Sequence, residues 1–581
     1  MNPLKPSSYA GPPRGEISEE RFSEVEVVHD LRVPMRDGVE MALDLVRPRG
    51  CEEPLPVLLG RTPYDKVIDR EWDPERYARL ARRGYIVALS DCRGRFNSDG
   101  VFVPMVDEHA DGHDTVEWIG EQSWCDGNVG MLGGSYGGWT QWYAASEAPR
   151  HLKAIVPYVS PPPSPWRNEP IQNGIYRLCY SEWMVVMGQR SWRVDGWAKE
   201  AFTKQQDYFK ALPVGDVDKA ANVESDWWRE FIQHPNYDDF WRRASYGPYN
   251  KIRVPALNVS GWWDMNFPGS PENFEGMRRE GATPESQIGQ KLVIGPWAHY
   301  PNGETLSGVD FGEQALIELE EYVLRFLDRW LKGTENGIED EDPVYVFVLN
   351  ANEWRAEKNW PIPGTEEVPF YFHSGGQANS LLGDGVLSTE EPATEEPPDR
   401  YEYDPENVGE TLWYLQGGPV DDRLATARED VLCYTTEALT EPLEVIGWVT
   451  CQLYAASSAL DTDWHARLVD VDPDGVARFL CHGMLRARFR ESMEKPKLLE
   501  PNEPTLFEFS MDATGIRFPV GHRIRIEIAS AWFTQWARNL NTGAENHWQE
   551  ADPVIAQQTV FHQPGLASRV VLPVVPPAAE S

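Results

Sequence analysis

The pattern of hydrophobic positions changes near residue 340, and the two parts of the chain predict different architectures. In the first part, unbroken apolar runs such as LPVLLGRTPY (55–64) and GYIVALSDCRG (84–94) alternate with helical patterns such as PERYARLARRG (74–84). Unbroken apolar runs are typical of strands buried on both faces, and their alternation with helices predicts an open parallel sheet covered by helices. This part is expected to have the α/β fold class. Its other elements are expected at 25–48 (a β-hairpin), 113–122, 129–132, 151–160, 256–264, 291–299 and 315–333.

The second part, residues 343–575, consists of short alternating runs such as VYVFVLN, VPFYFHS and LEVIGWVTCQLYA, separated by Pro, Gly, Asp and Asn. Many short strands without helices between them predict an all-β sandwich, of the jelly-roll type. The acidic, proline-rich stretch 388–399 is expected to be a loop inside it.

An insertion interrupts the first part. The segment between Ser160 and Ala256 far exceeds one crossover connection, and its many aromatic residues at helical spacing predict a helical cap over the sheet. The expected segments are a loosely held N-terminal arm (1–24), two halves of the α/β domain (25–160 and 251–340), the cap (161–250) and the C-terminal β-sandwich (341–581).

A serine lies at the turn between a predicted strand and a predicted helix. The sequence Gly133-Gly134-Ser135-Tyr136-Gly137 has the G-x-S-x-G spacing of a nucleophile elbow. A serine on such a sharp turn has strained backbone torsions, and the residues two positions before and after it need to lack side chains. The helix N-terminus that follows would face any anion that forms at the serine.

A serine nucleophile needs a histidine base and an acid that orients the base, and in folds with this elbow the order along the chain is Ser, acid, His. Between Ser135 and residue 340 there are three histidines. His151 is too close to the elbow and His234 lies in the cap, so His299, after the strand at 291, is the candidate base. The candidate acid is Asp264, which ends the strand run ALNVSGWW.

An oxyanion hole is also required. One donor would be the backbone N–H of Tyr136, the residue after the nucleophile, and the second should come from the loop at 61–64. Sequence reasoning leaves Tyr64 as one candidate among several polar groups there.

Two further patterns in the sequence could indicate a metal site or a sugar-binding surface. His109 and His113 have the spacing of a metal pair among acidic residues, but the missing H-E-x-x-H order and Gly112 favour a solvated acidic loop. The 24 tryptophans could form a sugar-binding surface on the sandwich, although most are expected in cores. No cofactor or metal is therefore expected.

The charged residues of the chain indicate which kinds of partner are unfavourable. With 54 basic and 92 acidic residues the net charge is −38, which argues against nucleic acid and anionic membranes as partners. The start of the chain lacks a secretory signal pattern and no long apolar stretch occurs, so a soluble cytoplasmic protein is expected. The seven scattered cysteines are expected to be reduced thiols.

Six ordered blocks carry a family resemblance: VPMRDGVEMALDLVRP, RTPYDK, DCRGRFNSDG, DTVEWIGEQSWCDGNVGMLGGSYGG, VSGWWD and IGPWAH. From Val25 to its C-terminus the chain resembles the cocaine esterase family of serine hydrolases, which also includes α-amino acid ester hydrolases, glutaryl acylase-like proteins and X-prolyl dipeptidyl peptidases. The resemblance implies an α/β-hydrolase domain with an inserted helical cap and a C-terminal jelly roll, whose active site lies where the three meet. It also implies Ser135 as nucleophile, Asp264 as acid, His299 as base, and the Tyr64 hydroxyl and Tyr136 amide as oxyanion donors.

The sequence differs from that of some family members at the positions that bind amino-acyl substrates. Members that act on α-amino acyl groups resemble one another in carrying acidic residues just after the catalytic Asp, whereas here Met265, Asn266 and Phe267 follow. Glu272, Glu275 or a cap residue could substitute.

Three functions follow as hypotheses. The first is a serine esterase, with amides as further substrates, that acts on a small molecule through an acyl-enzyme and has Trp166 and Phe267 as walls of its acyl pocket. The second is an X-prolyl dipeptidyl aminopeptidase or an α-amino acid ester hydrolase or acylase that needs a free amine. The third is a carbohydrate-binding protein with a vestigial hydrolase domain. The resemblance also implies self-association, as a homodimer or a larger assembly.

Overall fold

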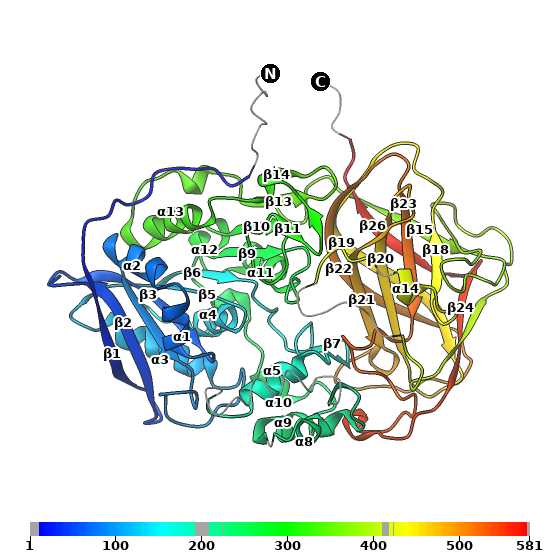
Figure 1. Cartoon of the computed structure of the whole chain (residues 1–581), viewed down its shortest axis with the longest axis horizontal. Coiled ribbons are helices and arrows are strands. Elements are labelled where there is room, and N and C mark those ends of the chain that lie inside the picture. The colour runs from blue at the N-terminus through cyan, green and yellow to red at the C-terminus, as the bar shows by residue number, and fades with distance from the viewer. Residues whose placement is uncertain (1–10, 192–207, 224, 410–416, 422, 578–581) are drawn as a thin grey trace.

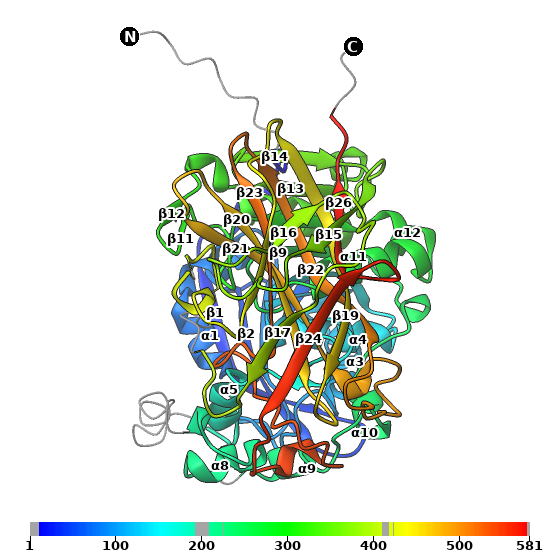
Figure 2. The same cartoon turned by 90° about the vertical axis from the view of Figure 1, so that its right-hand side faces the viewer.

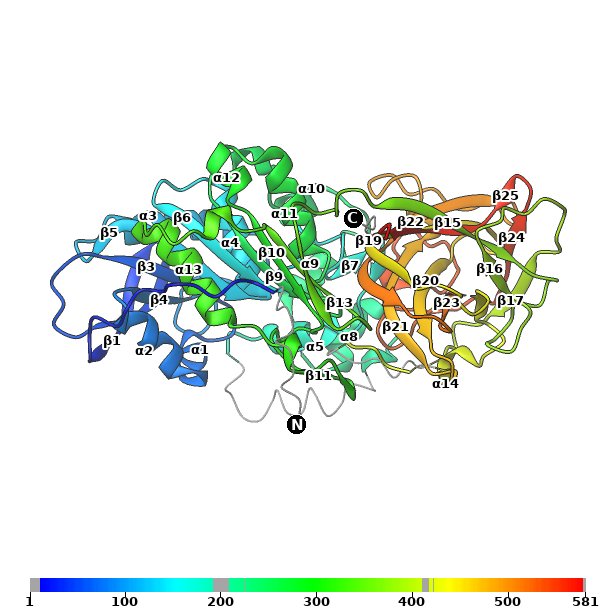
Figure 3. The same cartoon turned by 90° about the horizontal axis from the view of Figure 1, so that it is seen from above.

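Two lobes, each built on a large β-sheet, lie side by side along the long axis of the molecule (Figure 1, Figure 3). The computed structural model describes residues 11–191, 208–223, 225–409, 417–421 and 423–577. No helix among these residues is both long enough and apolar enough to cross a lipid bilayer.

The first lobe contains a ten-stranded sheet in the order β1-β2-β4-β3-β5-β6-β9-β10-β13-β14. The strands from β4 to β13 are parallel along this order, and antiparallel pairs close both ends. The expected hairpin and parallel sheet are both present. The strands are β1 (Val25–Pro34), β2 (Glu40–Pro48), β3 (Leu55–Thr62), β4 (Ile86–Asp91), β5 (Cys125–Gly134), β6 (Leu152–Tyr158), β9 (Leu257–Gly261), β10 (Lys291–Gly295), β13 (Val344–Val348) and β14 (Glu353–Glu357).

Helices cover this sheet, and α4 is buried at every position. The helix α4 packs on β3, β5 and β6 and against α3, and α13 also packs on β5 and β6. Helix α13 ends at Gly333, whose φ of 69° is the left-handed conformation that glycine adopts without a side-chain clash. The helices are α1 (Lys66–Trp72), α2 (Pro74–Arg82), α3 (Glu108–Gly120), α4 (Tyr136–Ser146), α11 (Gly269–Glu280), α12 (Pro284–Ile288) and α13 (Leu319–Lys332).

The inserted cap contains short helices, as expected, and also a two-stranded hairpin. Its aromatic core continues into the sandwich, because Trp548 contacts Tyr176 at 5.2 Å and Trp228 at 5.7 Å between ring centroids. The described cap elements are β7 (Ile171–Gln172), β8 (Ile175–Tyr176), α5 (Tyr180–Met187), α8 (Val217–Ala220), α9 (Asp226–Phe231) and α10 (Asp239–Arg243).

The second lobe is the expected β-sandwich, a network of twelve strands (Figure 2). The acidic stretch 388–399 connects β16 to β17, as predicted. The strands are β15 (Glu366–His373), β16 (Val386–Ser388), β17 (Asp399–Tyr403), β18 (Leu432–Thr435), β19 (Leu443–Ser457), β20 (Asp463–Val471), β21 (Ala477–Arg486), β22 (Thr505–Phe518), β23 (Arg523–Ala529), β24 (Ala556–Gln563), β25 (Leu566–Ala567) and β26 (Arg569–Val574).

The boundary at 340 differs from the prediction. The run VYVFVLN, expected as a sandwich strand, forms β13, which pairs in parallel with β10 and extends the first sheet. All five residues of β13 are buried. An unbroken apolar run is typical of a strand covered on both faces, which is the environment of β13. The sandwich therefore begins at β15.

The N-terminal arm is also more firmly held than expected. The described part of the arm, from residue 11, runs along the first lobe, where the Ser18 backbone N–H donates to Asp328 of α13 at 2.8 Å. Lys332 of α13 donates to the Ser18 hydroxyl at 3.0 Å.

The acidic stretch around His109 forms helix α3, which corrects the expectation of a solvated loop. Glu108, at its first position, pairs with Arg61 of β3 at 2.8 Å, and the two side chains are 4% and 0% exposed. The pair fastens α3 to the strand that ends beside the elbow. Sequence spacing could not show this, because the partner lies 47 residues away.

We expect Arg61→Met to lower the free energy of unfolding by about 3–5 kcal/mol, since it leaves a carboxylate buried without its partner. The double change Arg61→Met with Glu108→Gln should recover most of the loss. Arg14→Met serves as the control because the Arg14–Glu318 pair is 72% and 50% exposed, and removing such a pair costs less than about 1 kcal/mol. Denaturant titration of the variants tests this. Equal effects of Arg61→Met and Arg14→Met would contradict it.

Candidate active site

Ser135 occupies a strained turn between β5 and α4. Its φ and ψ are 57° and −123°, a region that residues with side chains rarely adopt. The flanking glycines make the turn possible: a Cβ atom on Gly133 would lie 3.2 Å from the Gly137 carbonyl oxygen. The Ser135 backbone N–H donates to the Tyr158 carbonyl at 3.0 Å, which ties the turn to β6. The sequence pattern therefore forms the sharp strand-to-helix turn that is expected of a nucleophile elbow.

Asp264 and His299 meet at the ends of neighbouring strands. Asp264 follows β9 and His299 follows β10, and His299 Nδ1 lies 2.8 Å from Asp264 Oδ1. The other carboxylate oxygen accepts a hydrogen bond from the Ser260 hydroxyl at 3.0 Å. The Asp264 side chain is 0% exposed, so its charge acts on the imidazole with little screening by water.

The surroundings of His299 act on its pKa in opposite directions. Burial lowers the pKa, whereas the hydrogen bond and negative charge of Asp264, and to a smaller extent the charge of Glu169, raise it. The two carboxylates prevail, so the pKa lies above its ordinary value. An imidazole with a raised pKa is a stronger base, which suits proton removal from an alcohol.

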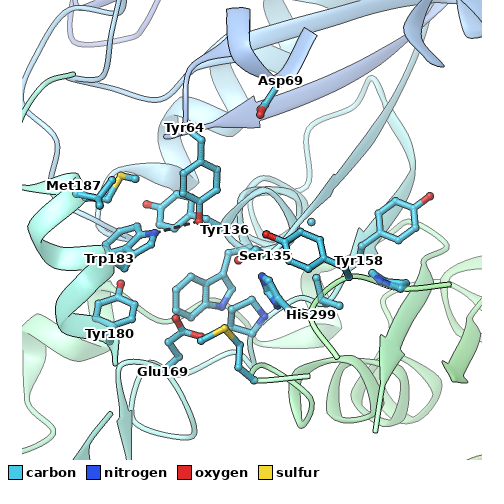
Figure 4. Close-up of a pocket in the computed structure, with 18 of the residues that line it drawn as sticks. Tyr64, Asp69, Ser135, Tyr136, Tyr158, Glu169, Tyr180, Trp183, Met187 and His299 are labelled. Carbon is cyan, nitrogen blue, oxygen red and sulfur yellow. Dashed lines mark hydrogen bonds between the residues drawn. The ribbon is translucent and has the colours of Figure 1, made fainter. Parts of the chain in front are cut away.

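Ser135 and His299 line one cavity of about 890 Å³ (Figure 4). Its walls come from the elbow, from the loops after β3 and β10, and from cap helix α5, which contributes Tyr180, Trp183 and Met187. In the close-up, Ser135 and His299 lie between the α5 side chains and Tyr158 of β6. A substrate could thus extend to both sides of the serine.

Both residues expected to donate to an oxyanion reach this cavity. The Tyr64 hydroxyl, at the end of the loop after β3, makes a side-chain hydrogen bond with Ser135, and burial raises the pKa of the phenol. Tyr136 is the first residue of α4, where backbone N–H groups have no acceptor within the helix. Its own hydroxyl is engaged elsewhere, donating to Glu108 at 3.0 Å.

The cavity is rich in carboxylates that sequence reasoning did not place there. Asp69, Glu169, Glu182 and Glu320 line it, and Arg76 is the basic residue among its described lining. Glu169 and Glu182 are 8% and 4% exposed, and each has one buried oxygen that accepts no hydrogen bond from a described residue.

Burial makes these carboxyl groups harder to ionise. It raises the pKa of Asp69 to about 6 and the pKa of Glu182 to about 7, and it also raises the pKa of Glu169. Negative charge on these buried carboxylates near neutral pH costs free energy, because water is largely excluded. A bound cation would offset that cost.

The expected pocket walls are not where the sequence suggested. Trp166 and Phe267 are absent from the described lining of the cavity. Trp166 packs against Phe489 of the sandwich at 5.2 Å, and Phe267 packs against Trp262 at 5.4 Å. Both residues are 3% exposed, and Phe267, like Trp166, also contacts a sandwich ring, that of Trp448 at 6.5 Å. In the sequence, the helical spacing of Tyr180, Trp183 and Met187 is the feature that could have indicated the residues that line the cavity.

The glutamates considered as substitutes for an amine-binding group also lie elsewhere. Glu272 pairs with Arg167 at 2.6 Å and Glu275 accepts a hydrogen bond from Trp448 at 3.0 Å. The described residues contain no group of three or more His, Cys, Asp or Glu arranged to hold a metal ion.

Comparison with known proteins connects this geometry to a family. Residues 37–301 match the family model of X-Pro dipeptidyl-peptidase (S15 family), and residues 336–571 match that of the X-Pro dipeptidyl-peptidase C-terminal non-catalytic domain. Among solved structures, an α-amino acid ester hydrolase superposes with a TM-score of 0.80 at 25% identity, covering 99% of this chain and 100% of that one. An aminopeptidase from the marine sediment archaeon Thaumarchaeota archaeon, with a TM-score of 0.80, 24% identity and coverage of 99% and 100%, shares the fold.

A third protein has a higher sequence identity to this chain than these two structures. The cocaine esterase of Rhodococcus sp. (strain MB1 Bresler) is 37% identical over 580 residues, which cover 94% of this chain and 98% of that protein. Similarity of this extent, together with the elbow and the two-lobed fold, shows that the chain belongs to the cocaine esterase family and is a serine ester hydrolase.

Proposed function

We propose that the chain cleaves carboxylic esters of small molecules through an acyl-enzyme formed on Ser135. The observation that carries this proposal is the hydrogen bond between Asp264 and His299, because His299 lines the same cavity as Ser135. His299 takes the hydroxyl proton while the Ser135 oxygen attacks the ester carbonyl carbon. Asp264 holds the imidazole so that Nδ1 carries a proton and Nε2 is available as base.

The tetrahedral intermediate places a negative charge on the former carbonyl oxygen. The Tyr64 hydroxyl and the Tyr136 backbone N–H are the proposed donors to this oxygen. When the intermediate collapses, His299 returns the proton to the leaving alcohol. Water then attacks the acyl-enzyme by the same route, releasing the carboxylic acid and restoring the serine hydroxyl. The same steps would cleave an amide if His299 protonated the leaving amine.

A second candidate, an amino-acyl substrate, is favoured by one observation. Glu169 and Glu182 line the catalytic cavity from the cap, and each has a buried oxygen without a hydrogen bond from a described residue. Glu169 Oε2 lies 4.0 Å from Arg177 Nη1, so its charge is partly balanced, whereas the raised pKa of Glu182 arises from burial alone. An ammonium group in this cavity would meet an unbalanced carboxylate.

The nucleophile is tested by labelling. A fluorophosphonate should add once per chain, on Ser135, and Ser135→Ala should lose both the label and at least about 10³-fold in turnover of aryl esters. Ser160→Ala is the control, since Ser160 is another buried serine after a sheet strand. Intact-mass spectrometry with peptide mapping reads the result, and a label on any other serine would refute the assignment.

The base is tested by the pH dependence of kcat/KM. Because the reaction needs neutral His299, kcat/KM should rise with pH, with a midpoint above 6.5, the ordinary histidine value. Asp264→Asn removes the charge that contributes most to raising this pKa, ahead of that of Glu169, so the midpoint should move to lower pH while kcat falls by about 10⁴-fold. A midpoint that stays in place in Asp264→Asn would show that another group titrates.

The amino-acyl candidate is tested with paired substrates. If the amine is recognised, an amino-acyl ester should exceed its des-amino analogue in kcat/KM by at least about tenfold, or 1.4 kcal/mol. Glu182→Gln and Glu169→Gln should each reduce that ratio, whereas Glu275→Gln, outside the cavity lining, should leave it unchanged. A ratio near one in the unmodified enzyme would leave the plain ester as the substrate class.

A further inference from the structure

The cap makes a hydrogen bond to the proposed oxyanion donor. The indole N–H of Trp183, on α5, donates to the Tyr64 hydroxyl oxygen at 3.1 Å, as the dashed line in Figure 4 shows. Residue 183 lies 119 positions from residue 64, so this contact joins the cap to the loop after β3. We propose that Trp183 is a positioning residue that completes the oxyanion hole by orienting the proton of Tyr64.

The direction of this hydrogen bond decides where the phenol proton goes. An indole N–H is a donor only, whereas a phenol has one proton and can also accept. Since Trp183 occupies an acceptor position on the Tyr64 oxygen, the phenol proton must point to a different partner. The Ser135 side chain also hydrogen-bonds the Tyr64 hydroxyl, and its oxygen can accept the phenol proton when the Ser135 proton is given to His299. In that arrangement the phenol proton faces the reacting atoms.

The indole is held firmly enough to act in this way. Its ring is stacked against Tyr180 at 4.8 Å and against Tyr136 at 5.8 Å. Trp227 packs edge-on at 5.9 Å and Phe102 lies at 6.3 Å. The stacking on Tyr136 links the indole to the residue whose backbone N–H is the other proposed donor.

The contribution of Trp183 should grow along the reaction. As the substrate oxygen becomes negative, it draws the Tyr64 proton toward itself, and the phenol oxygen gains negative charge. A hydrogen bond donated to that oxygen then strengthens, because donors to charged acceptors bind more tightly and linked hydrogen bonds polarise one another. An interaction that is stronger in the transition state raises kcat. This inference rests on the proposed function, since it requires Tyr64 to be an oxyanion donor.

A double-mutant cycle on the whole enzyme separates this role from simple packing. Trp183→Phe keeps an aromatic ring and removes the N–H. We expect it to lower kcat of an aryl ester by about tenfold with little change in KM, whereas Tyr64→Phe should cost about a hundredfold or more. In the Tyr64→Phe background, Trp183→Phe should cost less than about twofold. Trp227→Phe is the matched control, because the Trp227 indole N–H has no described hydrogen-bond partner.

A second measurement keeps the test decisive if Trp183→Phe loosens the cap. A trifluoromethyl ketone forms a tetrahedral adduct with an oxyanion, so its inhibition constant should weaken by about tenfold in Trp183→Phe and remain near its original value in Trp227→Phe.

The outcomes separate the two proposals. An equal loss from Trp183→Phe with and without the Tyr64 hydroxyl would overturn the inference and leave the proposed function intact. If Tyr64→Phe alone had no effect while Ser135→Ala was inactive, the assignment of Tyr64 would fail and the inference with it. An active Ser135→Ala enzyme would overturn the proposed function itself.

Discussion

The backbone strain at Ser135 is the constraint on which the proposed active site depends. A residue with a side chain at φ 57° and ψ −123° costs about 1–3 kcal/mol, and such a conformation persists only where the surrounding structure enforces it. Here a parallel strand, a helix and a hydrogen bond to the neighbouring strand β6 enforce it. The turn raises the hydroxyl above the edge of the sheet. Asp264 and His299 arrive at the same edge because β9 and β10 run parallel to β5.

The chemistry of the cavity is divided between the domains. The α/β domain supplies Ser135 and His299, with Asp264 hydrogen-bonded behind His299, whereas the cap supplies aromatic rings and two glutamates. The sheet determines which reaction is possible, and the cap shapes the space that a substrate enters. The sandwich supplies none of the described lining residues. It contacts the cap through Trp548, which packs on Trp228, and through Trp536, whose ring centroid lies 4.8 Å from the Arg177 guanidinium of the cap.

The sequence predicted those parts of the site that local geometry determines. Gly133 and Gly137 mark the elbow because their spacing follows from steric contacts within a few residues, and the positions of Asp264 and His299 follow from the parallel strands that precede them. The pocket walls could not be predicted in this way. Trp166 and Phe267 have the expected aromatic character, but which ring faces a cavity depends on how the cap and sandwich meet. The buried pairing of Glu108 with Arg61 and the parallel pairing of β13 with β10 likewise depend on partners distant in sequence.

The packing of the cap on the sandwich has a consequence for biosynthesis. Tyr176 and Trp228 emerge from the ribosome long before Trp548, which they contact in the finished molecule. The sheet of the first lobe can pair its strands early, whereas these aromatic contacts of the cap must wait until Trp548 has been translated. The nascent chain therefore carries Ser135 through most of its synthesis before the rings that join the cap to the sandwich can meet.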